Sequence, residues 1–175
     1  MSDDLVFVVD ENDKPQTPQP RSLVIANKLW RRTSAILVVD PVHKRILCQK
    51  RSENKDERPG FWIVMFGGKS NPGETPEQTA IREFKEESGI TLSLTDLHFS
   101  LKFKSEKHYQ FEYLFWTYWQ GDSETIKFQE SEISAVAWVD IDTVLENLTR
   151  PTDGWYCYGD GELATIRRAK VSIGS

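Results

Sequence analysis

Three glutamates gather on one face of a short segment near the middle of the chain. Glu83, Glu86 and Glu87 fall within an arc of about 100° when Pro76 to Ser88 is drawn as a helix. Glu83 and Glu87 are like charges one turn apart, which weakens an isolated helix. Mg²⁺ prefers oxygen ligands and often links carboxylates to substrate phosphates. The spacing therefore indicates a divalent-metal site, unless the three glutamates form an ordinary solvated acidic face.

The segment that carries these glutamates has clear helix boundaries. Thr75 is a good N-cap, Pro76 suits the first helical position, and Gln78 completes a capping box with Thr75. Gly89 provides a left-handed stop. The pattern predicts a helix from Pro76 to Ser88, and glycines on its N-terminal side predict a tight loop that lets backbone approach a ligand.

This stretch resembles a known motif. Gly68, then Glu74 after five residues, then Arg82 through Ile90, is similar to the Nudix box at every fixed position. Nudix proteins have an α/β/α sandwich fold with a mixed β-sheet. Most of them hydrolyse a diphosphate bond in a nucleoside diphosphate linked to another group, with Mg²⁺ or Mn²⁺. The resemblance implies that fold, that pyrophosphatase activity and that cofactor here.

The resemblance also implies residue roles, which are expectations at this point. Glu83, Glu86 and Glu87 would be catalytic metal ligands, together with the backbone carbonyl of Gly68. A structural pair would hold the loop against the helix, namely Glu74 and Arg82. Many Nudix proteins use another glutamate just before a late strand. Glu130 and Glu132 are the candidates for it, and the distance from Trp138 favours Glu132.

Phosphate contacts require basic groups near the acidic helix. Arg51 ends an expected strand beside the motif, and Lys69 lies within it. Both are predicted to bind substrate, with Arg51 preferred because a planar guanidinium suits phosphate. Trp62, Trp116 and Trp138 lie in strand patterns and are expected in the core. The aromatic segment 155–158 is a candidate for the mouth of the pocket.

The remaining elements follow from hydrophobic patterns. Helices are expected at Asp142 to Leu148 and Glu162 to Lys170. Strands are expected at six places, of which the first two form a hairpin: Ser34 to Asp40, Arg45 to Arg51, Phe61 to Phe66, His98 to Phe103, Tyr109 to Trp119 and Ala135 to Val139.

The first 28 residues differ from the rest. Leu5 to Val9 is a short apolar stretch, and the prolines of the following segment, Asp10 to Arg21, predict an extended arm or linker without a helix. The chain is therefore divided into an N-terminal strand and arm at 1–28 and a Nudix domain at 29–175.

Composition limits the other function classes. The chain has 175 residues, of which 38% are hydrophobic and 28% charged, with a net charge of -5. This balance indicates a globular domain and argues against nucleic acid as a partner. The expected partner is a small diphosphate, such as a nucleotide derivative, which the Nudix resemblance implies. No secretion signal or membrane span is expected, two distant cysteines suit a reducing compartment, and a cytoplasmic location is expected. The oligomer is expected to be a monomer or a homodimer.

Two alternatives remain beside hydrolysis. Four segments form an outline outside the box: Val8 to Asn12, Leu29 to Arg32, Gln49 to Ser52 and Pro59 to Trp62. This outline resembles isopentenyl-diphosphate isomerase, but Ile63 to Gly67 stands where that family has its catalytic cysteine. Ile25 and Arg31 replace its metal-binding histidines, and no other histidine has the required position. The second alternative is a non-catalytic domain that binds a nucleotide or a partner, although no acidic position of the motif is lost. Within the hydrolase interpretation, an RNA-cap or RNA 5′-end hydrolase also stays open, although the net negative charge argues mildly against it.

Overall fold

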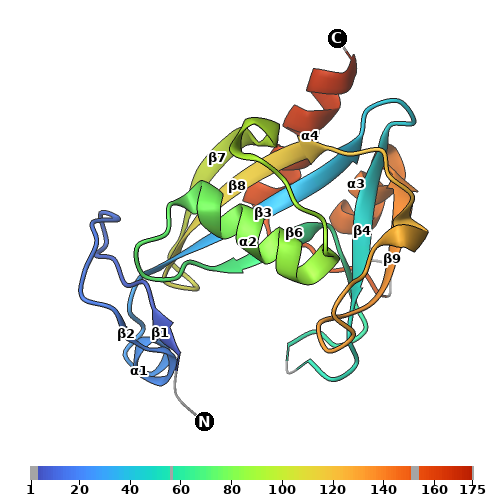
Figure 1. The fold of residues 1–175 in the computed structure, drawn as a ribbon. Helices are drawn as coiled ribbons and strands as arrows, with labels where there is room; N and C mark the ends of the chain where they lie inside the picture. Colours follow the sequence, from blue (N-terminus) through green and yellow to red (C-terminus); the bar gives the residue numbers. More distant parts are fainter. Residues whose placement is uncertain (1–3, 56, 151–153, 175) are drawn as a thin grey trace.

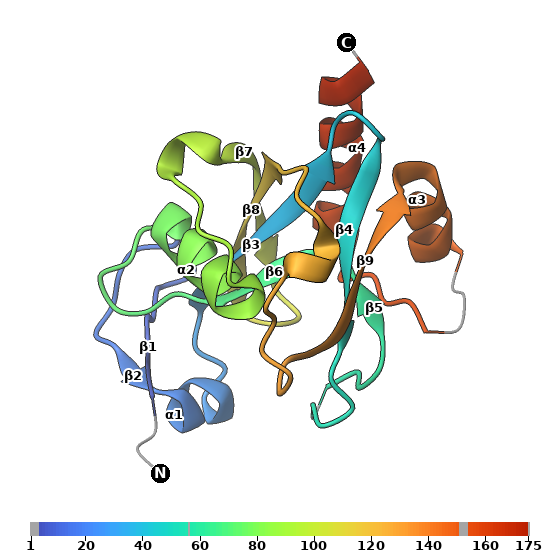
Figure 2. The same ribbon diagram turned by 45° about the vertical axis from the view of Figure 1, so that its right-hand side comes forward.

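The protein is an α/β/α sandwich, as the sequence predicts. The computed structural model describes residues 4–55, 57–150 and 154–174. A seven-stranded mixed sheet lies between helix α2 (Pro76–Ser88) on one face and helices α3 (Ile141–Thr149) and α4 (Asp160–Gly174) on the other (Figure 1, Figure 2). In the described part of the chain, no helix is both long and apolar enough to cross a bilayer.

The order of the sheet is β5-β4-β3-β8-β7, with β6 also paired to β3 and β9 also paired to β4. Strand β3 is parallel to β8 and antiparallel to β6 and β4. Two 3₁₀ turns, Leu94–Asp96 and Ser123–Thr125, lie in the connections. The seven strands are β3 (Arg31–Asp40), β4 (Arg45–Arg51), β5 (Trp62–Ile63), β6 (Met65–Lys69), β7 (His98–Ser105), β8 (Gln110–Tyr118) and β9 (Ile133–Asp140).

One predicted strand is wrong. The run from Phe61 to Phe66 was expected to be a single strand, but it divides at Val64 into β5 and β6. Strand β5 pairs with β4, whereas β6 pairs with β3. The chain thus changes its partner strand within a continuous apolar run. A hydrophobic pattern cannot show such a change, because the residues on both sides of it are buried.

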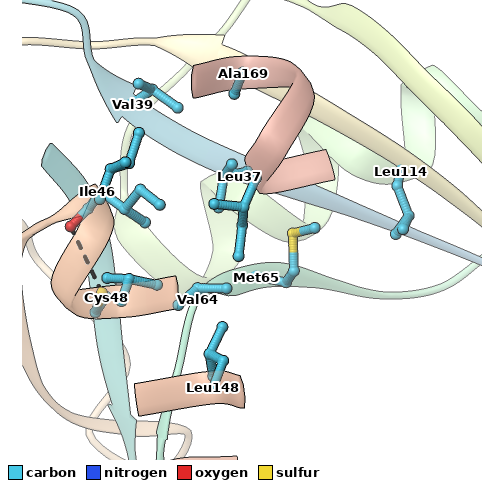
Figure 3. Close-up of a cluster of buried hydrophobic side chains, with 12 residues drawn as sticks. Leu37, Val39, Ile46, Cys48, Val64, Met65, Leu114, Leu148 and Ala169 are labelled. Atoms are coloured by element: carbon cyan, nitrogen blue, oxygen red, sulfur yellow. Dashed lines mark hydrogen bonds between the residues drawn. The ribbon is translucent and has the colours of Figure 1, made fainter. Parts of the chain in front are cut away.

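Each face of the sheet has its own hydrophobic core. Beneath α2, the fully buried Phe84 packs edge-on against Phe66, with 5.3 Å between ring centroids. The opposite core joins strands β3, β4, β6 and β8 to helices α3 and α4, and Figure 3 shows side chains such as Leu37, Met65 and Leu148 within it. The two cores fix the positions of α2 and α4, the helices that flank the site.

The N-terminal segment contains a helix that the prolines did not predict. Strands β1 (Leu5–Val6) and β2 (Gln19–Pro20) pair, and helix α1 (Arg21–Ala26) follows directly. Pro20 forms the N-cap of α1, a position where proline does not oppose a helix. The segment is also tied to the sheet, because the Phe7 N–H donates to the Ser70 carbonyl at 3.3 Å.

The loop before α2 is held by an ion pair inside a network of hydrogen bonds. The Arg82 Nε donates to Glu74 at 2.7 Å, and Arg82 also donates to the Lys69 carbonyl at 2.9 Å. Glu74 further accepts from the Asn71 N–H and from the Thr79 hydroxyl. Burial of Glu74 opposes its ionisation, but these bonds hold its pKa at about 2. Its charge therefore contributes to folding.

Replacing Phe84 tests the packing of α2. Phe84→Ala should lower the free energy of unfolding by about 3–5 kcal/mol, because it leaves a cavity against Phe66. Lys85→Ala, an exposed change on the same helix, should alter it by less than about 0.5 kcal/mol. Urea denaturation followed by circular dichroism measures the free energy of unfolding of both variants. Equal losses in Phe84→Ala and Lys85→Ala would contradict the conclusion that Phe84 holds α2 against the sheet.

A second prediction concerns the pH dependence given by Glu74. Its pKa is lower in the folded than in the unfolded chain, so its contribution is full above about pH 4.5 and is lost as the pH falls toward about 2. Glu74→Gln should therefore destabilise the protein by about 1–3 kcal/mol at pH 7 and by progressively less below pH 4.5.

Denaturation midpoints at several pH values check the Glu74 prediction. Glu106→Gln in the exposed turn between β7 and β8 is the matched control. A constant difference between Glu74→Gln and the wild type down to about pH 2 would show that the charge of Glu74 is not responsible.

Candidate active site

Two carboxylates of α2 lie directly against the glycine pair of β6. A Cβ atom at Gly68 would lie 2.5 Å from the carboxyl carbon of Glu83. Next to it, the Gly67 N–H donates to Glu87 at 3.0 Å. Glu83, Glu87 and Gly68, which the sequence selects together, are thus brought together.

Burial and mutual repulsion destabilise the charged forms of these two carboxylates. Burial first, and then the nearby charge of Glu83, raise the pKa of Glu87 to about 8. Burial also raises the pKa of Glu83, while Arg82 opposes that change. A cation placed between the two would relieve both effects.

Glu86 is oriented differently from the other two glutamates of the helix. It is exposed, and its carboxylate accepts from Arg82 at 3.2 Å. The same guanidinium group donates to Glu83 at 2.9 Å. Within residues 4–55, 57–150 and 154–174, no three acidic, histidine or cysteine side chains already form a metal cluster.

The donor atoms nevertheless suit a hard divalent cation. Carboxylate oxygens are the ligands that Mg²⁺ and Mn²⁺ accept. The Glu83 carboxylate fills the space beside Gly68 that any side chain there would occupy, and Glu87 accepts from the neighbouring Gly67 N–H. The residues therefore fit the cofactor that the sequence predicts.

Glu132 lies at the same end of the site. Its charge contributes to the raised pKa of Glu87, and its carboxylate forms an ion pair with Lys55. The Glu132 carbonyl accepts from the Ser52 N–H at 2.9 Å, which fixes the backbone just before β9. Glu130 is exposed. The structure thus brings Glu132 near the acidic helix.

A pocket of about 180 Å³ opens beside the glycine pair. Arg51 and Tyr158 belong to its lining, so one predicted phosphate contact and one residue of segment 155–158 reach it. The Arg51 Nε donates to the Glu57 carbonyl at 2.9 Å. The lining also includes residues from β3, β4, β6, β8, α2 and α4, notably Thr33, Gln49, Met65, Gly67, Gly68, Glu87, Glu112, Leu114 and Glu162.

Lys69 is placed beside this lining rather than in it. Burial first, and then the charges of Arg21 and Arg31, lower the pKa of Lys69 to about 8. The charge of Glu83 acts on Lys69 in the opposite direction, so the two side chains are close enough to interact. Lys69 therefore lies between two basic side chains, Arg21 of α1 and Arg31 of β3, and the acidic helix, and it interacts electrostatically with both.

The tryptophans of the strands are less buried than the sequence suggested. Trp62, Trp116 and Trp138 pack against the two cores but remain partly exposed. Trp62 stacks on Trp155 with 6.0 Å between ring centroids. This contact fixes the start of segment 155–158 and helps to position Tyr158.

Several polar residues of the lining, among them Gln49, Glu112 and Glu162, were not selected from the sequence. Gln49, Glu112 and Glu162 come from β4, β8 and α4, which are far apart along the chain. No local motif surrounds them. For Glu162, the sequence offered one indication: it stands within the apolar pattern of α4. A charged residue on a buried helix face is rare unless it has a partner or a function.

Comparisons with known proteins agree with this geometry. Residues 29–157 match the NUDIX domain. The chain is 30% identical to the Nudix hydrolase YfcD of Salmonella typhi, over 79% of this chain and 73% of that protein. It is 38% identical to a Nudix hydrolase of Rhodococcus erythropolis over 51% of this chain.

The fold also matches a solved structure. DR0079 of Deinococcus radiodurans has a TM-score of 0.73 at 22% identity, over 94% of this chain and 98% of that one. The chain spans about half the length of several curated relatives, with 48%, 55% and 51% of three of them covered. From the matched domain, the relatives and the fold, we conclude that the chain belongs to the Nudix hydrolase family.

Proposed function

We propose that the protein hydrolyses a diphosphate bond in a nucleoside diphosphate linked to another group, with Mg²⁺ or Mn²⁺. The observation that carries this proposal is the contact of the Glu83 and Glu87 carboxylates with the Gly67-Gly68 backbone at the edge of a pocket. Family membership supports the reaction class.

Glu83, Glu86 and Glu87, with the Gly68 carbonyl, are the proposed metal-holding groups. When bound, the cation would neutralise the diphosphate and lower the pKa of an attacking water. Glu86 is held by Arg82, which also contacts Glu83, so one guanidinium group orients two of the three carboxylates. Glu74 keeps that guanidinium in place.

Hydrolysis of the anhydride breaks one P–O bond, and the water supplies the new oxygen to phosphorus and releases a proton. A glutamate of the acidic group takes this proton, and Glu132 is the proposed addition to the set from outside the helix. Its electrostatic interaction with Glu87 supports that assignment. Arg51 and Lys69 are proposed to contact the phosphates.

The isomerase alternative is disfavoured by the pocket. The catalytic cysteine of that family has no counterpart here, since no cysteine or histidine lines the pocket among the described residues. Cys48 is buried in the core between the sheet and helices α3 and α4 (Figure 3), and burial raises the pKa of Cys157 to about 12. A binding domain without turnover is disfavoured because every acidic position of the motif is present.

The direct test is product release from a panel of nucleoside diphosphate derivatives with Mg²⁺ or Mn²⁺. Glu86→Gln and Glu87→Gln should each lower kcat by at least about 100-fold with little change in stability, because each removes a carboxylate charge from the site. Glu77→Gln, in the first turn of the same helix, is the matched control.

Chromatography of both products identifies the bond that is cleaved, and isopentenyl diphosphate is included to test the isomerase alternative. Wild-type rates in both acidic variants would refute the metal-site assignment. Conversion of isopentenyl diphosphate to its isomer would refute the hydrolase reading.

A further prediction concerns Arg51. Arg51→Ala should raise KM by about 10- to 100-fold, because a charge-assisted hydrogen bond to phosphate is lost. Arg51→Lys should recover part of the loss. Lys50→Ala changes the neighbouring residue, which does not belong to the pocket lining, and should leave KM near the wild-type value. An unchanged KM in Arg51→Ala, measured by initial rates, would remove Arg51 from the site.

A further inference from the structure

Glu162 is a buried carboxyl for which the folded chain does not supply enough partners. Its residue is only 3% exposed, and it lies in the first turn of α4. One carboxyl oxygen accepts from the Tyr158 N–H at 2.7 Å. The other, Oε1, is buried without a hydrogen-bond partner among the described residues.

This free oxygen belongs to a residue of the pocket wall. Glu162 lines the same pocket as Gly68 and Glu87. A buried polar atom without a partner is costly, and a folded chain retains one where a ligand, ion or water completes it. A purely structural residue at this point, within an apolar core, would be expected to be apolar.

The position of Glu162 relative to the proposed metal site follows from the strand register. Gly67 is paired with Ala35, and Ala35 is paired with Leu114. A Cβ atom on Gly161 would lie 3.2 Å from Leu114, so α4 begins over that residue. Two strand spacings, about 10 Å, therefore separate the glycine pair from the strand beneath Glu162.

The far end of the pocket is acidic. Glu112 lines it as well, and its charge acts on Glu162. Hydrogen-bond acceptors gathered in this way disfavour another phosphate or carboxylate and favour a group that donates.

We propose that Glu162 determines specificity by accepting, through Oε1, a hydrogen bond from an N–H or O–H of the group attached to the diphosphate. The proposal rests on the hydrolase function proposed above. A nucleobase amine and a sugar hydroxyl share this chemistry, and the test distinguishes them.

The variant Glu162→Gln is informative because the amide has one acceptor oxygen. That oxygen is needed by the Tyr158 N–H, so the amide nitrogen is left to face the pocket. The change keeps the shape of the side chain and replaces an acceptor by a donor. Asp160→Asn, an exposed change in the same helical turn, is the matched control.

The assay compares kcat/KM for substrate pairs that differ by one donor. Cytidine and uridine diphosphate derivatives differ at a base amine, and ribose and 2′-deoxyribose forms differ at a hydroxyl. At pH 8.5, the wild type and Asp160→Asn should prefer the donor-bearing member of one pair by about 10-fold or more. Glu162→Gln should abolish or reverse that preference.

A pH series supplies a readout that a structural role would not move. Burial, opposed by the Tyr158 N–H and the Cys157 thiol and assisted by Glu112, raises the pKa of Glu162 to about 7. The preference of the wild type for the donor-bearing substrate should shrink below pH 7, because the protonated carboxyl can donate a hydrogen bond as well as accept one. The preference of Glu162→Gln should stay constant over the same pH range. The charged and titratable groups that face Glu162 are Glu112, Cys48, Cys157 and Tyr158. An effect of these groups that is the same for both substrates of a pair cancels in the ratio of their kcat/KM values.

The outcomes separate the two proposals. An active wild type whose preference is the same in Glu162→Gln, or that has no preference in any pair, overturns the role of Glu162 alone; a bound water would then complete Oε1. A wild type that cleaves nothing in the panel overturns the hydrolase function and this inference with it. Thermal unfolding verifies that Glu162→Gln is folded.

Discussion

The absence of side chains at two successive positions of β6 is the constraint on which the site depends. A Cβ atom at Gly67 would lie 2.1 Å from the Ser34 carbonyl oxygen, and one at Gly68 would meet the Glu83 carboxyl. The first contact, with backbone, would disrupt the pairing of β6 with β3, and the second would push the Glu83 carboxylate away from the strand. Two glycines thus allow an acidic helix to lie against the backbone of a strand.

That arrangement brings like charges together, and one guanidinium group offsets much of the repulsion. Arg82 contacts Glu74, Glu83 and Glu86 and also donates to the Lys69 carbonyl. It therefore joins the loop, the helix and the strand in one network. Glu87 lies outside the contacts of Arg82 and relies on the Gly67 N–H, in keeping with its raised pKa.

The sequence predicts the parts of the molecule whose causes are local. Helix α2 has the predicted bounds because its capping box, its proline and its terminal glycine lie within 15 residues of chain. The division of Phe61 to Phe66 into β5 and β6 depends on which strands are neighbours, and helix α1 depends on its packing against the N-terminal strands; neither is encoded locally. Glu162 was missed for the same reason, since its importance arises only when α4 is placed over β8.

The acidity of the pocket explains why basic side chains alone would not suffice for a diphosphate. Among the described residues, the lining has three carboxyl groups, Glu87, Glu112 and Glu162, and one basic group, Arg51. Where these carboxyls are ionised, a diphosphate entering alone would meet net repulsion in a partly enclosed site of low dielectric constant. The proposed divalent cations would reverse the sign of that interaction at the glycine end only, because the carboxylates proposed to hold them are there. The far end would stay rich in acceptors, so the same negative charge that would require a metal would also favour donor groups in the rest of the substrate.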